Sequence, residues 1–322
     1  MTQLAQTASR HTQSHPPVTA PMLAISSFSL HSVLGPLRLE RRGDDGAILP
    51  LSFDFPREHS LDEFGALVVQ RVGARAVELC QIQFDGDTPD RIAQLRAAMD
   101  DAGITVLTVP IDSGNLASGN AAWLADDEAR IIRWFDIAGQ LGAQYVRVNA
   151  GSPGYAMAAD ARPMLVQSLM RLGDAANARG LQLLVENHGG TSSDPDFMLG
   201  LLDDVGHDRL GLLLDLGNFE PLVTLSHGRF ADPDLDDAGL DFEPLYDRIA
   251  ALAPVARLVH AKSVDPARDG RPLPDLSRAL MIVRAAGYNG HISVEWEGHR
   301  GDPWAQTAAV AAQVRAVFPA LG

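Results

Sequence analysis

Eight short apolar segments, each followed by a stretch with helical patterning, constrain the fold of this chain more than any other feature. The apolar segments are rich in Val, Leu and Ile, as are strands buried on both faces of a parallel sheet. They lie at residues 22–31, 75–82, 104–112, 143–151, 181–189, 209–218, 256–263 and 291–298. The helical stretches lie at 60–73, 88–103, 126–142, 161–180, 194–206, 242–254, 273–287 and 302–318. The first of these begins with a capping-box pattern, Ser60 followed by Glu63.

This alternation predicts an α/β fold, a (β/α)8 TIM barrel. An open, doubly wound sheet is disfavoured because no glycine-rich phosphate turn follows the first strand. Residues 22–322 are expected to form a single catalytic domain, and the polar residues 1–21 a disordered N-terminal extension. After the first strand, LRLERR and AILPLSF flank the turn GDDG within residues 32–59, which predicts a hairpin-like insertion. Residues 219–241 form a second long connection, and long loops on this face of a barrel are often lids.

Composition excludes several classes of function. The formal net charge is −15 and Lys and Arg form no large cluster, so binding to nucleic acid or to an anionic membrane surface is disfavoured. No apolar run approaches the roughly 20 residues that span a bilayer. The first twenty residues lack the apolar segment of a secretory signal, and Cys80 is the single cysteine, so a cytoplasmic location is expected.

Polar side chains end the four later strands. Side chains two apart on a strand share a face, so Glu186, Asp215, His260 and Glu295 are delivered to one rim, the carboxyl end of the barrel. Three converging carboxylates would repel one another and raise each other's pKa unless a cation lay between them. Carboxylate oxygens and an imidazole nitrogen suit Mn²⁺, Mg²⁺, Co²⁺ or Zn²⁺. The pattern therefore predicts one divalent metal ion.

Each of these residues also has a structural interpretation. Glu186 could pair with Arg147 on the preceding strand, and Asp215 could cap the turn that follows it. His188 shares a face with Glu186 and could contact substrate or support a ligand.

Further candidates for substrate contact stand at the same rim. Lys262 could bind a substrate oxygen or pair with Glu297, and Asn218 could contact substrate or belong to a turn. His31 and Asn149 end the first and fourth predicted strands and are the remaining candidates.

The segments VENHGG, LLLDLGN, LVHAKS and SVEWEG, in this order, resemble the sugar phosphate isomerase/epimerase family, the xylose-isomerase-like TIM barrels. The resemblance covers the chain after residue 22, with its sharpest motifs in the last half. This group also includes ketose 3-epimerases, hydroxypyruvate isomerase, inosose dehydratase and endonuclease IV. The resemblance implies that one metal ion, Mn²⁺ above all, is held by Glu186, Asp215, His260 and Glu295. It further implies that Glu186 and Glu295 are catalytic and transfer protons.

The function implied is a metal-dependent isomerase or epimerase of a sugar or polyol ketone, acting by α-proton abstraction through a metal-stabilised enediolate. A metal-dependent lyase at the same site is the alternative, for an inosose, a dehydroshikimate-like acid or a 3-keto C- or O-glycoside. A non-catalytic sugar-binding barrel is a further rival. Ketose 3-epimerases of the group carry a His at the position of Asn218, so this chain departs from their pattern. The expected ligand is a small carbohydrate or polyol. Assembly into a homo-oligomer is a further expectation.

Overall fold

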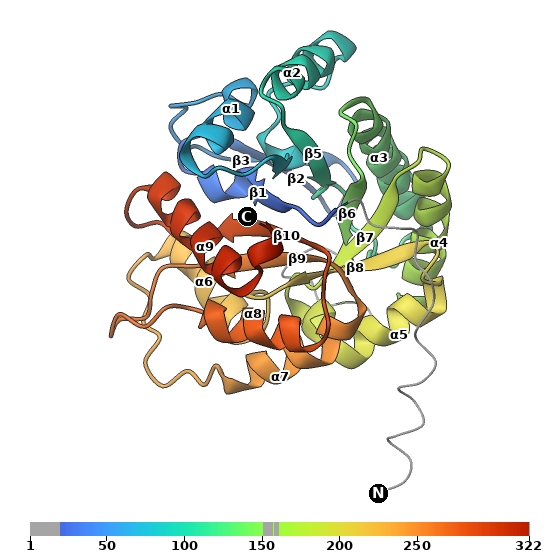
Figure 1. Ribbon diagram of the computed structural model, residues 1–322. Helices are drawn as coiled ribbons and strands as arrows, with labels where there is room; N and C mark the ends of the chain where they lie inside the picture. The colour runs from blue at the N-terminus through green and yellow to red at the C-terminus, as the bar shows by residue number, and fades with distance from the viewer. Residues whose placement is uncertain (1–19, 151–156, 158–160, 322) are drawn as a thin grey trace, which may run out of the picture.

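Eight parallel strands close into a barrel in the computed structural model, which describes residues 20–150, 157 and 161–321. Their order around the barrel is β1-β10-β9-β8-β7-β6-β5-β4 (Figure 1). The bounds are β1 Leu23–Ser26, β4 Ala76–Glu78, β5 Thr105–Pro110, β6 Tyr145–Asn149, β7 Gln182–Glu186, β8 Leu210–Asp215, β9 Ala256–Ser263 and β10 His291–Trp296. The predicted TIM barrel is therefore confirmed.

Helices cover the outside of the barrel (Figure 1). They are α1 Leu61–Arg71, α2 Pro89–Asp101, α3 Ala121–Gln140, α4 Arg162–Asn177, α5 Pro195–Val205, α6 Leu222–Ala231, α7 Glu243–Leu252, α8 Leu276–Ala285 and α9 Pro303–Val317. The outward side chains of the strands pack against these helices in the main hydrophobic core, as Val185 and Leu214 do. None of the helices in the described part of the chain is long and apolar enough to cross a membrane.

The inward side chains change from apolar to polar along the strands. A second, smaller apolar cluster fills the barrel and includes Ala24, Ala76, Tyr145, Leu184, Leu213 and Leu258. Two residues further along the same strands stand Ser26, Glu78, Arg147, Glu186, Asp215 and His260. Because side chains two apart on a strand share a face, this polar set forms a layer directly above the apolar one.

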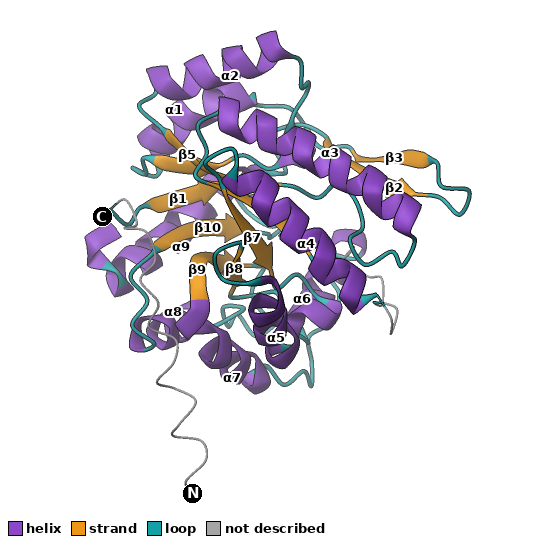
Figure 2. Ribbon diagram, turned by 90° about the vertical axis from the view of Figure 1, so that its right-hand side faces the viewer, coloured by secondary structure: helices purple, strands orange, loops and turns teal. Residues whose placement is uncertain are grey.

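The predicted hairpin is confirmed. Strands β2 (Leu37–Arg42) and β3 (Ile48–Phe53) pair antiparallel, and their turn includes Gly46 at a φ of +84°. The hairpin projects from the barrel beside α3 (Figure 2). Arg42 fixes it there, since its Nη2 lies 2.6 Å from Asp127 Oδ1 on α3.

The structure corrects several boundaries. The first strand ends at Ser26, whose hydroxyl accepts from the Phe28 amide and starts a 3-10 turn, Ser27–Leu30. Strand β4 has three residues instead of the eight in the predicted 75–82. Residues 219–241, predicted as a loop, contain helix α6. Residues 1–19 of the predicted extension, and Gly151 of the fourth predicted strand, lie outside the described residues.

Helix α3 begins at Ala121, five residues before the predicted start. The Asn120 side chain accepts hydrogen bonds from the amides of Ala122 and Trp123, which satisfies two of the amides that a helix start leaves free. An asparagine cap therefore adds more than one turn to this helix.

The capping box predicted at α1 is present, because Ser60 and Glu63 exchange side-chain hydrogen bonds with each other's backbone amides. We expect Ser60→Ala to lower the free energy of unfolding by about 1 kcal/mol. Chemical denaturation followed by circular dichroism would measure the change. A stability equal to that of the wild type would show that the box contributes nothing in this context.

Candidate metal centre at the carboxyl ends of the strands

Three carboxylate oxygens surround one imidazole nitrogen inside the mouth of the barrel. His260 Nδ1 lies 3.6 Å from Glu186 Oε1, 3.5 Å from Asp215 Oδ2 and 3.6 Å from Glu295 Oε2. All four side chains are buried, and each comes from a different strand among β7, β8, β9 and β10. Ligand atoms of Glu186, Asp215 and His260 lie within 4.8 Å of one another, so these three could hold a metal ion. Glu295 stands at the edge of the same cluster.

Two of the carboxylates are fixed through their other oxygen. Arg147 Nε lies 2.8 Å from Glu186 Oε2, and the amides of Gly217 and Asn218 donate to Asp215 Oδ1 at 2.7 and 2.9 Å. Both structural interpretations from the sequence are therefore present: Glu186 pairs with arginine and Asp215 caps a turn. They do not exclude a ligand role, because the second oxygen of each carboxylate faces the cluster.

The same arrangement holds for the other two residues. His260 Nε2 lies 2.9 Å from Glu78 Oε1, which leaves Nδ1 to face the carboxylates. Glu295 Oε1 lies 3.4 Å from Lys262 Nζ, and its Oε2 accepts from the Ser26 hydroxyl at 3.2 Å. Each of the four side chains is thus held by the protein and presents one atom to the cluster.

Glu78 is a residue of the candidate site that sequence reasoning missed. It ends the three-residue strand β4, is completely buried, and contacts a residue 182 positions later through the barrel interior. A carboxylate that accepts from the second nitrogen of an imidazole fixes the ring's tautomer and orientation. The available signal was a glutamate in an inward position near the end of an apolar strand, the same signal that marked Glu186.

Burial and mutual repulsion set the protonation states of the metal-free cluster. Burial raises the pKa of Glu186 to about 8, helped by the charges of Asp215 and Glu295 and opposed by Arg147. Burial also raises the pKa of Glu295. For His260, burial acts to lower the pKa, but the charges of Glu78 and Glu295 outweigh it and raise the pKa well above its usual value. Near neutral pH the cluster therefore holds protons that a metal ion would have to displace.

Arg147 belongs to a network on the β5–β6 side of the cluster. Its Nη1 lies 2.6 Å from Asp112 Oδ1, and the Asn149 amide donates to the same oxygen at 3.0 Å. Asn149, a candidate for substrate contact, is thus engaged with Asp112. Its position beside Glu186 in the β6–β7 register keeps it at the rim.

Lys262 and Asn218 lie inside the cluster. Lys262 forms an ion pair with Glu297, as its structural interpretation required, and also donates to Asn218 Oδ1 at 3.0 Å. The Asn218 amide donates to Glu186 Oε1 at 3.1 Å. Asn218 therefore connects a carboxylate of the cluster to the lysine.

The two remaining candidates differ in position. His188 is partly exposed near Arg147 and Asp112, and burial followed by the charge of Arg147 lowers its pKa to about 3, so the ring is neutral. His31 contacts the rings of Phe55, Phe230 and His299 instead of the four clustered residues. Burial lowers the His31 pKa to about 4, although its hydrogen bond to the Phe28 carbonyl opposes the shift.

Residues 67–316 match the family described as xylose isomerase-like TIM barrel, so the chain belongs to this family and the predicted resemblance is confirmed. Among solved structures, it is similar to a xylose isomerase-like TIM barrel protein from Mycobacterium smegmatis in complex with magnesium, with 18% identity over 94% of this chain and 98% of that one and a TM-score of 0.63. No curated protein matches the sequence significantly.

Two sugar epimerases share the fold. A D-psicose 3-epimerase solved in the presence of D-fructose has 15% identity over 92% of this chain and 97% of its own, with a TM-score of 0.59. A 3-keto-D-glucoside 4-epimerase from E. coli has 15% identity over 80% and 94%, with a TM-score of 0.58.

The Glu78–His260 contact predicts a measurable effect on metal affinity. Glu78→Gln keeps the shape of the side chain but removes the charge that orients the imidazole and raises its basicity as a ligand. We therefore expect Mn²⁺ to bind about 10–100-fold more weakly. Isothermal titration calorimetry on the metal-stripped protein would measure this. Glu128→Gln is the matched control, because Glu128 is a buried glutamate paired with Arg171. An unchanged Mn²⁺ affinity in Glu78→Gln would contradict the assigned role.

The raised pKa values predict that metal binding releases protons. Glu186, with a pKa of about 8, is largely protonated at pH 7, and His260 carries a proton that must leave Nδ1. Metal and proton compete, so affinity should rise as pH increases from 6 to 8. Calorimetry in buffers of different ionisation enthalpy would count the released protons. Affinity that falls over this range would show the sign to be wrong.

Proposed function

We propose that this protein is a divalent-metal-dependent isomerase or epimerase of a sugar or polyol ketone. The observation that carries the proposal is the convergence of Glu186 Oε1, Asp215 Oδ2 and Glu295 Oε2 on His260 Nδ1. Membership of the xylose isomerase-like family and the fold shared with sugar epimerases support it.

The donor atoms fit a divalent cation. Three carboxylate oxygens and one imidazole nitrogen suit Mn²⁺, the ion we expect, as well as Mg²⁺, Co²⁺ or Zn²⁺. Asp215 Oδ2 and His260 Nδ1 are buried, make no hydrogen bond within the described residues and face each other 3.5 Å apart, an arrangement that fits a shared cation. A bound cation would act as a Lewis acid that polarises the substrate carbonyl and stabilises enediolate charge.

Glu186 and Glu295 are proposed as the proton-transfer groups. One carboxylate takes the proton from the carbon next to the carbonyl, and the C–H electrons pass into an enediolate. The other carboxylate returns a proton, to the opposite face of that carbon in an epimerase. Arg147 and Lys262 hold the outer oxygens of these carboxylates, so the inner oxygens are aligned before substrate arrives.

Asn218 is proposed to position these groups. A carboxamide is neither protonated nor deprotonated near neutral pH, so Asn218 cannot serve as an acid or base. Its hydrogen bonds to Glu186 and Lys262 assign it to alignment of the carboxylate instead. His188, Lys262, Asn149 and His31 stay proposals for substrate contact.

A chelator and add-back assay tests the function. The stripped enzyme would be supplied with Mn²⁺ and a panel of ketoses, inososes and 3-keto glycosides in D₂O. An isomerase or epimerase incorporates deuterium at the carbon next to the carbonyl without net loss of water. Loss of water or cleavage of a glycosidic bond would assign the lyase instead. Sugar binding that is insensitive to the chelator, without turnover, would assign a binding protein.

Replacement of either proposed proton-transfer group should stop turnover. We expect Glu186→Gln and Glu295→Gln each to lower kcat by about 10²–10⁴-fold, because an amide accepts no proton. Circular dichroism would show that both variants fold, and Glu128→Gln would serve as the control away from the cluster. Wild-type rates in both variants would refute the assignment.

A further inference from the structure

The tryptophans of this chain separate into two groups. Of the four, Trp296 and Trp304 are each 4% exposed and belong to the interior. Trp123 and Trp134 are partly exposed, and both stand on α3. Eleven residues, or about three helical turns, separate them, so they share one face of the helix. That face is turned toward the β2–β3 hairpin, as the contacts of Arg42 with Asp127 and Trp123 show.

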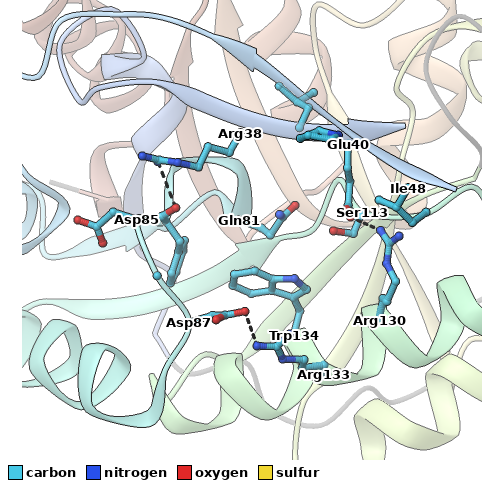
Figure 3. Close-up of a pocket in the computed structure, with 14 residues that line it drawn as sticks. Arg38, Glu40, Ile48, Gln81, Asp85, Asp87, Ser113, Arg130, Arg133 and Trp134 are labelled. Carbon is cyan, nitrogen blue, oxygen red and sulfur yellow. Dashed lines mark hydrogen bonds and ion pairs between the residues drawn. The ribbon is translucent and has the colours of Figure 1, made fainter. Parts of the chain in front are cut away.

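Two cavities of about 600 and 620 Å³ lie between α3 and the hairpin. Trp134 lines the first and Trp123 the second, and the two cavities share Glu40, Ile48 and Arg130. We call the combined space the hairpin groove. Figure 3 shows its first half, with Glu40 and Ile48 of the hairpin on one side, Arg130 and Trp134 of α3 on the other, and Gln81 between them.

Charges in the first half of the groove compensate one another. Arg130 pairs with Glu40, and Arg133 with Asp87. Arg38 donates to the Phe84 carbonyl, and Asp85 pairs with Arg57 and Arg91. Each of the three arginines and three carboxylates that line this half thus has a partner within the protein. A charged ligand would have to compete with these internal pairs, whereas a neutral polar ligand would not. The groups available to it are the Trp134 ring, the Gln81 amide and the Ser113 hydroxyl.

The groove adjoins the candidate metal centre. Gln81 Oε1 accepts from the Asp112 amide at 3.2 Å, and Ser113 is the next residue in the chain. The Asp112 carboxylate contacts Arg147, which contacts Glu186. A short chain of side chains thus links the groove to the cluster, and both lie at the carboxyl ends of the strands.

We propose that the hairpin groove binds the outer ring or rings of a neutral glycoside or oligosaccharide. Sugar rings present flat C–H faces that pack on tryptophan, while their hydroxyl groups exchange hydrogen bonds with amides and hydroxyls. That this ligand is also the substrate, with its reacting ring at the metal centre, rests on the proposed function. The substrate class is then a glycosylated ketone larger than a single sugar.

Saturation-transfer NMR and calorimetry would test the binding. The probes are cellotetraose, maltotetraose and xylotetraose, with glucose as the single-ring comparison, and all titrations contain EDTA. We expect at least one tetrasaccharide to bind more tightly than glucose. Trp134→Ala and Trp123→Ala should each weaken that binding by roughly three- to tenfold.

A matched control is available on the same hairpin. Phe53 is 46% exposed and lines neither cavity, so Phe53→Ala removes an exposed aromatic ring without touching the groove. Its oligosaccharide affinity should equal that of the wild type. Circular dichroism and Mn²⁺ affinity would show that the tryptophan variants stay folded.

The proposal is overturned if no tetrasaccharide binds better than glucose, or if the Trp123→Ala/Trp134→Ala double variant binds as the wild type does. Because EDTA removes any metal, these results are independent of catalysis. Oligosaccharide binding by a protein that fails to bind Mn²⁺ would refute the proposed function and leave the groove assignment standing. Metal-dependent turnover of free ketoses without oligosaccharide binding would refute the groove assignment and leave the proposed function standing.

Discussion

The contact between Glu78 and His260 is the constraint on which the rest of the site depends. Both side chains lie inside a closed barrel, where an unpaired charge would be costly. Once Glu78 occupies Nε2, the imidazole can present only Nδ1 to the carboxylates of the neighbouring strands. The orientation of one ring thus fixes the point on which three strand ends converge. A short strand three places away around the barrel supplies the group that decides it.

Burial of so many acidic groups requires cations of fixed position. Arg147 and Lys262 supply two, and each holds an outer oxygen of a clustered carboxylate. Because the guanidinium of Arg147 also contacts Asp112, it bridges two acids and cannot turn away from Glu186 without leaving both. Burial, with a smaller contribution from the neighbouring carboxylates, still raises the pKa values of Glu186 and Glu295. A divalent ion would relieve the repulsion between the carboxylates, so the metal-free cluster is expected to favour binding a divalent cation.

The residue pattern along one strand predicts which side chains point into the barrel, but it does not predict contacts between strands that are distant in the sequence. Alternation along β7 to β10 placed Glu186, Asp215, His260 and Glu295 on inward positions, because the direction of a side chain on a strand is a local property. Glu78 was missed since its importance arises from a partner across the barrel, which no local pattern encodes. The rival interpretations of Glu186 and Lys262 could not be separated for a related reason. The pair of Glu186 with Arg147 leaves the other glutamate oxygen facing the cluster. The pair of Lys262 with Glu297 leaves Nζ donating to Asn218 as well, so neither structural pair excludes the other role.

The error at the start of α3 has a functional consequence. A helix that began at residue 126 would leave Trp123 in a loop, with no fixed relation to Trp134. The Asn120 cap extends the helix to Ala121, so both rings stand on one rigid face opposite the hairpin. The strands of the barrel thus carry the buried charged cluster, while the hairpin and the extended helix line the groove beside it. Substrate selection in such an arrangement can change through loops and helix ends without disturbing the buried charges below.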